Sequence, residues 1–215
     1  MSKSTKSLAL SAMFLALCFV LPYLTGNNYQ LGSMLLLMHI PVLLCGLSCG
    51  WQWGLGVGFI APLLRSLLVG APPMPNTAVP MAFELAAYGM FAGLIYHWLD
   101  TATIKSFGSM SENTKTTVKL YISLLLAMLL GRIVWGLVKY AFVSLFIPDG
   151  VFTMAAFLSG AFIIAWPGIV IQLVIIPPII LALKRAKLTI QGSASQSDWS
   201  PTCQSYYGKK AVRSW

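Results

Sequence analysis

Hydrophobic residues follow one another in six long runs along this chain. The runs lie at about residues 8–24, 34–48, 54–70, 79–98, 119–146 and 154–183. A helix needs about 20 mostly apolar residues to cross the hydrocarbon core of a bilayer. The pattern therefore predicts an all-α, polytopic membrane protein with six transmembrane helices. The second and third runs are short, whereas the fifth and sixth are long enough to tilt or to extend beyond the bilayer.

The runs belong to one predicted membrane domain, residues 1–189, and a polar tail follows at residues 190–215. The tail is rich in Ser, Gln and Gly without a clear period, which predicts disorder or adventitious sequence. At the other end of the chain, Lys3 and Lys6 precede an apolar run, as they do in a secretory signal. That run continues without a small-residue cleavage site, so we interpret it as the first span.

Lysine and arginine are distributed unevenly among the segments that connect the runs. They occur before the first run, in the loop 99–118 and after the sixth run, whereas the connectors 25–33, 71–78 and 147–153 contain none. Because positively charged connectors stay in the cytoplasm, both termini are predicted to be cytoplasmic. The charge-free connectors are then external. Those at 25–33 and 71–78 are expected to be loops, either lids over a site or plain surface turns.

Composition supports a membrane protein over a soluble one. The chain is 58% hydrophobic and 9% charged, whereas soluble domains carry about 25% charged residues. The net charge of +9 lies mostly in the two tails and one loop, so it indicates topology more than a nucleic-acid partner. Four cysteines without a second pair or a neighbouring His predict neither a disulfide framework nor a zinc site.

Five basic or acidic side chains inside predicted spans are expected to share the outer half of the membrane. They are His39, Arg65, Glu84, Arg132 and Lys139, and they come from four different runs. A charged group at the centre of a span costs about 2.5–3.5 kcal/mol on insertion scales, so such groups normally face a bundle interior or a water-filled cavity. Three cations against one carboxylate leave a positive surplus, which an anionic ligand would relieve.

The spacing of Arg132, Trp135 and Lys139 places them on one face of a helix. A guanidinium group can hold a carboxylate or phosphate by two parallel hydrogen bonds. Structural readings of these side chains stay open: Arg65 and Glu84 as a bridge, Lys139 as a group that reaches the headgroups, and the tryptophan as a packing residue. His39 can equally be a satisfied core histidine.

The chemistry of an enzyme is missing from the sequence. We find no G-x-S-x-G, H-E-x-x-H or phosphate-binding loop motif, and Glu84 is the one acid within a predicted span. His39 and His97 fall near opposite membrane faces and cannot share a metal ion. We therefore expect a protein that is not an enzyme and has no catalytic residues, metal or cofactor.

Small residues recur at four-residue spacing, which lets helices approach closely in lipid. Ala12 and Ala16 form such a pair on the first predicted span, and glycines repeat on the second, third and fourth. Packing within the bundle accounts for the glycines. The alanine pair is the candidate for contact with another subunit.

Four segments resemble a known family. They are residues 38–46 (MHIPVLLCG), 57–66 (VGFIAPLLRS), 72–78 (PPMPNTA) and 81–89 (MAFELAAYG). Together with the six-helix count, they resemble the substrate-binding S components of energy-coupling factor (ECF) transporters, the vitamin importers of bacteria. The resemblance extends over about residues 5–187.

The resemblance implies a function and partners. An S component captures a water-soluble vitamin from outside and docks on a transmembrane coupling subunit through an alanine-bearing face of its first helix, which Ala12 and Ala16 match. Two cytoplasmic ATPases drive the cycle, and the loops after helices one and three gate the site. This chain would then lie in the bacterial plasma membrane.

The positive surplus favours an anionic vitamin, with pantothenate first and folate, niacin, lipoate or biotin as alternatives; riboflavin fits the charge less well. The expected substrate-binding residues are His39, Arg65, Asn76, Glu84, Arg132, Trp135 and Lys139. Rival hypotheses are a stand-alone channel or proton-coupled carrier and a structural membrane subunit without a ligand.

Overall fold

Helices are the regular elements of the described part of the chain, as the hydrophobic runs predict. The structure, a computed structural model, describes residues 3–25, 34–102, 112–146, 153–186 and 188–189. The helices are α1 (Lys3–Val20), η1 (Leu21–Thr25), α3 (His39–Cys49), α4 (Trp51–Val69), α5 (Ala78–Ala102), α6 (Glu112–Phe146), α7 (Met154–Leu158), η3 (Ser159–Ile163) and α8 (Trp166–Arg185). The polar tail and most of the connectors 25–33 and 147–153 lie outside the described residues.

Five of these helices are long and apolar enough to cross a membrane: α1, α4, α5, α6 and α8. The second hydrophobic run gives a shorter element than expected, because α3 begins at His39 and has 11 residues. At 1.5 Å per residue, α3 is about 16 Å long, roughly half the hydrocarbon thickness. The described residues thus contain five helices of spanning length and one shorter apolar helix.

The helix of the second run is interrupted at residues 36–38. Leu36 has a φ of 51°, in the left-handed region that a branched side chain rarely adopts. A backbone break inside an apolar bundle requires hydrogen bonds from neighbouring elements, because lipid supplies none. We call residues 36–38 the helix break.

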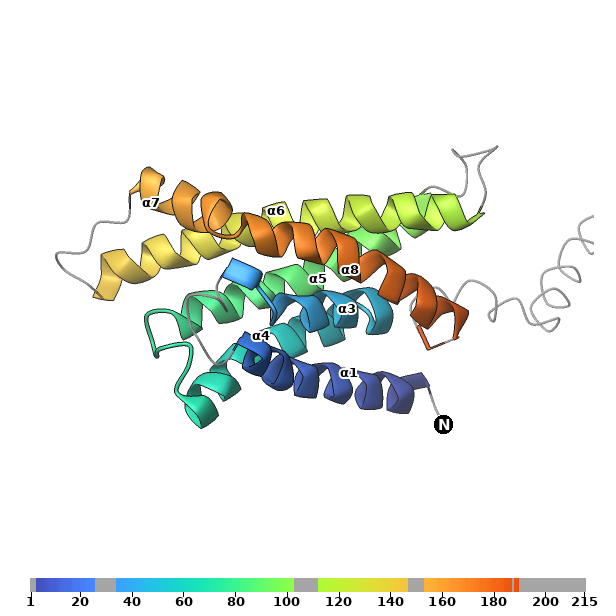
Figure 1. The fold of residues 1–215 in the computed structure, drawn as a ribbon, viewed down its shortest axis with the longest axis horizontal. Helices are drawn as coiled ribbons and strands as arrows, with labels where there is room; N and C mark the ends of the chain where they lie inside the picture. Colours follow the sequence, from blue (N-terminus) through green and yellow to red (C-terminus); the bar gives the residue numbers. More distant parts are fainter. Residues whose placement is uncertain (1–2, 26–33, 103–111, 147–152, 187, 190–215) are drawn as a thin grey trace, which may run out of the picture.

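The sixth hydrophobic run is also interrupted, although its pattern predicts one long helix over 154–183. It forms α7, a turn of π-helix (η3) and then α8. Pro167 occupies the first turn of α8, where its missing N–H is no loss. The long α8 therefore starts only at Trp166, and the shorter pieces before it lie beside the end of α6 (Figure 1).

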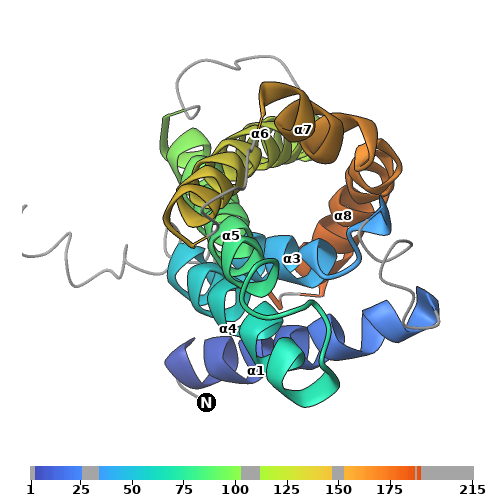
Figure 2. The same ribbon diagram turned by 90° about the vertical axis from the view of Figure 1, so that its left-hand side faces the viewer.

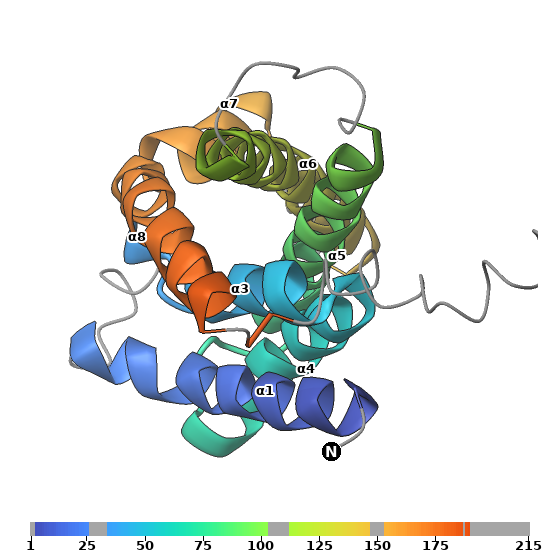
Figure 3. The ribbon, with the colours of Figure 1, turned by 90° about the vertical axis from the view of Figure 1, so that its right-hand side faces the viewer.

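Four helices form a closed ring. Figures 2 and 3 show α3, α5, α6 and α8 in this ring from its two ends, with α4 and α1 as further layers on the side of α3 and α5. Each neighbouring pair around the ring is in contact: α3 with α5, α5 with α6, α6 with α8 and α8 with α3. The start of α1 and the end of α8 lie at the same end of the bundle (Figure 1).

Glycine lets α3, α4 and α5 pack backbone against backbone. A Cβ on Gly89 would lie 2.3 Å from the carbonyl oxygen of Gly54, and one on Gly58 would lie 2.4 Å from that of Leu85. Gly50 joins α3 to α4 at a φ of 107°, so a single residue forms the turn between the two helices. The glycine spacing is therefore explained by packing inside the bundle.

The outer surface of the long helices is apolar. Large hydrophobic side chains such as Leu67, Leu137, Leu145 and Val174 are between 64% and 77% exposed. A soluble monomer rarely exposes apolar area on this scale. Lipid is the solvent that suits this surface.

Candidate functional site

A buried ion pair joins α5 to α6. The Nη1 atom of Arg132 lies 2.9 Å from Oε1 of Glu84, and the two residues are 5% and 3% exposed. Gly131 permits the approach, since a Cβ there would lie 3.0 Å from the Tyr88 ring, one helical turn after Glu84. The carboxylate that the sequence offered as a partner for Arg65 is thus paired with Arg132.

His39 brings α3 to the same place. Its Nε2 lies 3.6 Å from Oε1 of Glu84, and its ring meets that of Tyr88 edge-on with centroids 5.0 Å apart. His39 is 1% exposed. The separation from Glu84 exceeds an ordinary hydrogen bond, so the imidazole is positioned by packing on Tyr88 and by the position of His39 at the start of α3.

The helix break connects His39 to α8 by hydrogen bonds. The carbonyl oxygen of Leu36 accepts hydrogen bonds from the backbone N–H of His39 at 2.9 Å and from Nε2 of Gln172 at 3.5 Å. Gln172 lies in α8 and is fully buried. A chain of polar contacts therefore runs from Arg132 through Glu84, His39 and the break to Gln172, with one member from each helix of the ring.

Several polar atoms of this chain are buried without a hydrogen-bond partner among the described residues. They are Nε and Nη2 of Arg132, Oε1 of Gln172, both ring nitrogens of His39, and Oε1 of Glu84, which lies in the ion pair without hydrogen-bond geometry. Buried polar groups are nearly always hydrogen-bonded, so each such atom requires a physical reason. A binding site that awaits its ligand is one such reason.

Arg65 approaches the break from α4. Its Nη1 lies 3.6 Å from the sulfur of Met38, and the residue is 7% exposed. The thiol of Cys18 in α1 reaches the Met38 carbonyl oxygen at 3.8 Å. Side chains of α1, α4 and α8 therefore all contact the helix break. Arg65 contacts Met38, the residue that precedes His39 in the sequence.

Lys139 and Asn76 form a separate pair that fixes the loop before α5. The ammonium of Lys139 donates to the side-chain oxygen of Asn76 at 2.7 Å and to its carbonyl oxygen at 2.8 Å. At the α4 end of the loop, the hydroxyl of Ser66 donates to the Pro72 carbonyl at 2.6 Å. The loop 71–78 is thus attached to α6 and α4, which is where a lid over the ring would be anchored.

Trp135 of α6 lies against α7. Its ring stacks on Phe157 with centroids 6.2 Å apart and planes 25° apart. A Cβ on Gly160 would lie 3.1 Å from the indole. The stacking partner of Trp135 in the structure is therefore another side chain of this protein.

The structure brings three of the seven expected residues together: His39, Glu84 and Arg132. Arg65 adjoins them at the break, whereas Lys139 with Asn76, and Trp135, lie in two further contacts. Gln172 was missed, because sequence reasoning weighed ionisable groups and passed over a single amide in the apolar run of α8. That amide, the one polar uncharged side chain between Trp166 and Lys184, was the available signal.

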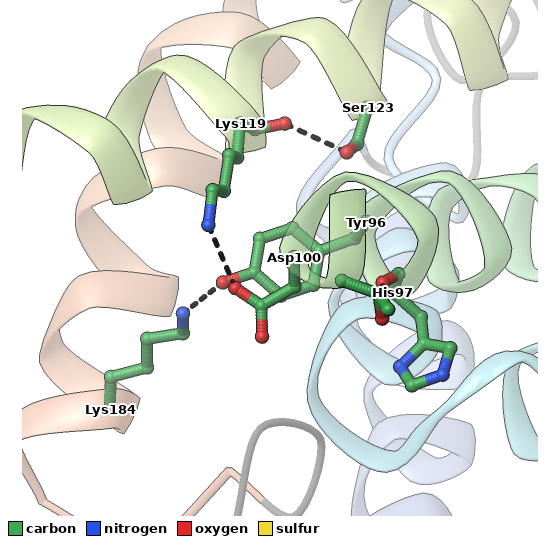
Figure 4. Close-up of polar contacts among 7 residues, drawn as sticks. Tyr96, His97, Asp100, Lys119, Ser123 and Lys184 are labelled. Carbon is green, nitrogen blue, oxygen red and sulfur yellow. Dashed lines mark hydrogen bonds and ion pairs between the residues drawn. The ribbon is translucent and has the colours of Figure 1, made fainter. Parts of the chain in front are cut away.

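A second polar cluster lies at the end of α5 that carries Asp100. Lys119 of α6 pairs with Asp100 at 2.9 Å, and Lys184 of α8 donates to the hydroxyl of the buried Tyr96. Figure 4 shows both lysines pointing toward this pair of side chains, while the His97 ring points away. These contacts join α5, α6 and α8, and each charge has a partner, so we read the cluster as structural.

Two more expectations concern metal ions and partner contact. Within the described residues, no group of three His, Cys, Asp or Glu side chains lies close enough to hold a metal ion. On α1, Ala12 and Ala16 are exposed, while Ser11, Phe14 and Cys18 face the bundle. The alanine pair is thus available on the outer face of the protein.

An all-helical bundle with an apolar exterior, five helices of spanning length and buried polar groups inside defines a multi-pass integral membrane protein. The family model of the ECF transporter substrate-specific component matches residues 6–180, and the chain belongs to this family. It is a transport component and not an enzyme, and it is the substrate-binding subunit of an ECF transporter. S components bind a small molecule and work with a transmembrane coupling subunit and ATPases. No curated protein and no solved structure matches the chain.

Proposed function

We propose that this S component captures an anionic, water-soluble vitamin from outside a bacterial cell, with pantothenate as the first candidate. The observation that carries the proposal is the state of Arg132. Glu84 takes its Nη1 atom, whereas Nε and Nη2 have no partner among the described residues. Nε and Nη2 form one edge of the guanidinium, and that edge matches the two oxygens of a carboxylate.

Energetics favours a ligand at this edge. A buried donor without an acceptor costs about 1–3 kcal/mol, and more when it is charged. The side chain of Arg132 is 6% exposed, so water gives little relief. A carboxylate would satisfy both donors at once. Because Glu84 already balances the charge of Arg132, the charge of the ligand would be balanced by a second nearby cation. That cation is Arg65, which contacts Met38 in the helix break.

The other expected residues have distinct proposed roles. Glu84 orients Arg132, and His39 adds ring nitrogens next to the ion pair. Lys139 and Asn76 hold the loop 71–78 in place over the site. Trp135 lines the α6 side, and Arg65 adds a positive field from the direction of the break.

Charge alone leaves several vitamins as candidates. Pantothenate is small, flexible and anionic, and folate, niacin, lipoate and biotin share the carboxylate. Riboflavin lacks that carboxylate and matches Arg132 less well. The proposal therefore names the anionic group as the primary determinant and pantothenate as its best example.

The proposal also covers how the bound vitamin is passed to the other subunits of the transporter. The exposed face of Ala12 and Ala16 docks on the coupling subunit, because small residues allow close helix approach in lipid. Two cytoplasmic ATPases drive release. The start of α1 and the end of α8 face the cytoplasm, in agreement with the lysines and arginines of both tails, and the protein resides in the bacterial plasma membrane.

Calorimetry of the purified chain against a vitamin panel tests the proposal. We expect one carboxylate vitamin to bind more tightly than about micromolar, and Arg132→Lys to weaken it by roughly tenfold or more, because lysine keeps the charge and loses the two-point edge. Lys119→Arg is the matched control, since Lys119 also lies in α6 and already pairs with Asp100. Its affinity should equal that of the unchanged chain. Absence of binding by every vitamin defeats the proposal.

A stand-alone proton-coupled carrier is the second candidate. The specific observation in its favour is the proximity of His39 and Glu84, two titratable groups buried in the bundle. It requires uptake by liposomes that contain this chain and no other subunit. Vitamin binding without such uptake decides for the S component.

A further inference from the structure

We propose that Gln172 of α8 is an additional ligand-binding residue, and that the ligand carries an N–H or O–H donor besides its anionic group. This inference rests on the proposed function, because it concerns the same site. It adds a second requirement for the ligand, a hydrogen-bond donor, to the negative charge that the proposed function requires.

Gln172 lies on a face of α8 that is otherwise apolar. Its neighbours on that face are Gly168, Ile176 and Ile180, all buried. A polar amide in such surroundings costs free energy unless both of its ends are hydrogen-bonded. One end is explained, because Nε2 donates to the Leu36 carbonyl of the helix break.

The other end is not explained by packing. Oε1 of Gln172 is buried and accepts no hydrogen bond from the described residues. Turning the amide over would place Oε1 against the Leu36 carbonyl, so that two acceptors would face each other. The bond to Leu36 therefore fixes the orientation and leaves an acceptor available.

The position of this acceptor connects it to the anion site. Leu36 receives hydrogen bonds from both Gln172 and His39, and His39 adjoins Glu84 and Arg132. All four helices of the ring in Figure 2 contribute to this chain of contacts. Open donors lie at the Arg132 end and an open acceptor lies at the Gln172 end. A ligand complementary to both ends offers an acceptor pair at one end and a donor at the other.

This pattern separates the candidate vitamins. Pantothenate has hydroxyl and amide donors, and biotin and folate have N–H donors. Niacin and lipoate in their ionised forms have neither O–H nor N–H groups. The inference therefore predicts a ligand from the first group, even though all five carry the carboxylate that Arg132 requires.

The experiment is calorimetry on the full chain and on two variants. Gln172→Met keeps the length of the side chain and removes the amide. Ser48→Ala is the matched control, because the Ser48 hydroxyl is likewise buried and has no partner in the described part of the chain, but it lies about three helical turns along α3 from the break. The probes are pantothenate, biotin, folate, niacin and lipoate, followed by derivatives of the bound vitamin in which one donor at a time is methylated.

We expect the unchanged chain to bind a donor-bearing vitamin, and one methylated derivative to bind about tenfold or more weakly. In Gln172→Met that derivative and its parent should bind equally, since the acceptor is gone, whereas Ser48→Ala should keep the difference. Preferred binding of niacin or lipoate overturns the inference and leaves the anion site intact. Equal weakening of parent and derivatives by Gln172→Met also overturns it. Absence of all binding overturns it together with the proposed function.

Discussion

Glu84 and Arg132 form a buried ion pair between α5 and α6. Removing a carboxylate and a guanidinium from water costs several kcal/mol for each ion, and their attraction repays this only with good geometry. Such a pair is weak support for stability, so its presence in the ring requires another reason. The pair keeps Arg132 in place with one edge of its guanidinium unpaired within the described part of the chain. Two hydrophobic residues at these positions could not do this.

Glu84→Gln tests how far the fold depends on this pair. The substitution leaves Arg132 buried without its counter-charge, which should lower the free energy of unfolding by about 3–5 kcal/mol. Asp100→Asn is the control, because Asp100 also pairs with a cation of α6 but its side chain is 38% exposed; it should cost less than about 1 kcal/mol. Thermal unfolding in detergent measures both. An equal loss of stability in Glu84→Gln and Asp100→Asn would contradict the expectation that the buried ion pair contributes more than the partly exposed one.

Lys139→Met tests the attachment of the loop 71–78. The change removes both hydrogen bonds to Asn76, while the bond from Ser66 to Pro72 remains. If the loop covers the site, the bound vitamin should dissociate several times faster, at about 1 kcal/mol for the lost bonds. Asn76→Ala removes only the side-chain bond and should have the smaller effect. Dissociation measured by ligand exchange gives both rates, and unchanged rates would mean that the loop is a plain turn.

At the residue scale, sequence reasoning identifies the groups but not their partners. His39, Glu84 and Arg132 were predicted to converge because each is too costly to leave in lipid. The pairing of Glu84 with Arg132 was not predictable, since it depends on the rotation of α5 against α6. Gln172 was missed because an uncharged amide carries a smaller penalty and gives a weaker signal.

At the scale of elements, close packing of α3, α4 and α5 builds the platform that holds the site. Gly46, Gly54 and Gly89 meet where the three helices cross, and a Cβ on Gly46 would lie 2.2 Å from the carbonyl of Gly89. Without a hydrophobic effect between helices in lipid, such contact is a main source of association. Glu84 and His39 lie on two of these helices, so their separation depends on the glycine contacts.

Gly89→Ala tests this platform. The added methyl would lie 2.3 Å from the Gly54 carbonyl oxygen, so α4 and α5 must separate. We expect a loss of stability of about 1–3 kcal/mol, as for overpacked cores. Gly56→Ala is the matched control within the same helix layer, because nothing lies within 4 Å of its Cβ; it should be neutral or stabilising by up to about 1 kcal/mol. The melting temperatures of the two variants decide, and equal shifts contradict the close-contact account.

Element boundaries were the part of the fold that the hydrophobic pattern predicted least well. The second and sixth runs look continuous, yet the structure interrupts them at residues 36–38 and 159–165. The first break is stabilised by a hydrogen bond from Gln172, far away in sequence. Periodicity reports which residues are apolar and does not reveal where a distant side chain satisfies an open backbone group.

At the scale of the whole molecule, the polar groups are divided between the ring and the cluster of Lys119, Lys184, Asp100 and Tyr96. In that cluster each charge has a partner, which ties α5, α6 and α8 together at one end. The ring keeps donors and an acceptor open. The proposed recognition site therefore differs from the cluster in its buried donors and acceptors without partners among the described residues. The proposed site takes no residue from α1, so we expect ligand capture to be independent of the proposed docking face on that helix.

Ala12→Leu combined with Ala16→Leu tests that independence. Both alanines are exposed on α1, so the larger side chains fit in lipid without disturbing the bundle, but they prevent a second helix from approaching closely. We expect vitamin affinity to stay within about twofold, because distant sites act additively, while the coupling subunit and ATPases are no longer recovered with a tagged chain from bacterial membranes. Leu125→Trp, a bulky change at an exposed position of α6, should leave recovery intact. Loss of affinity in the alanine variant would place α1 in the binding site, and normal recovery would move the docking surface to another helix.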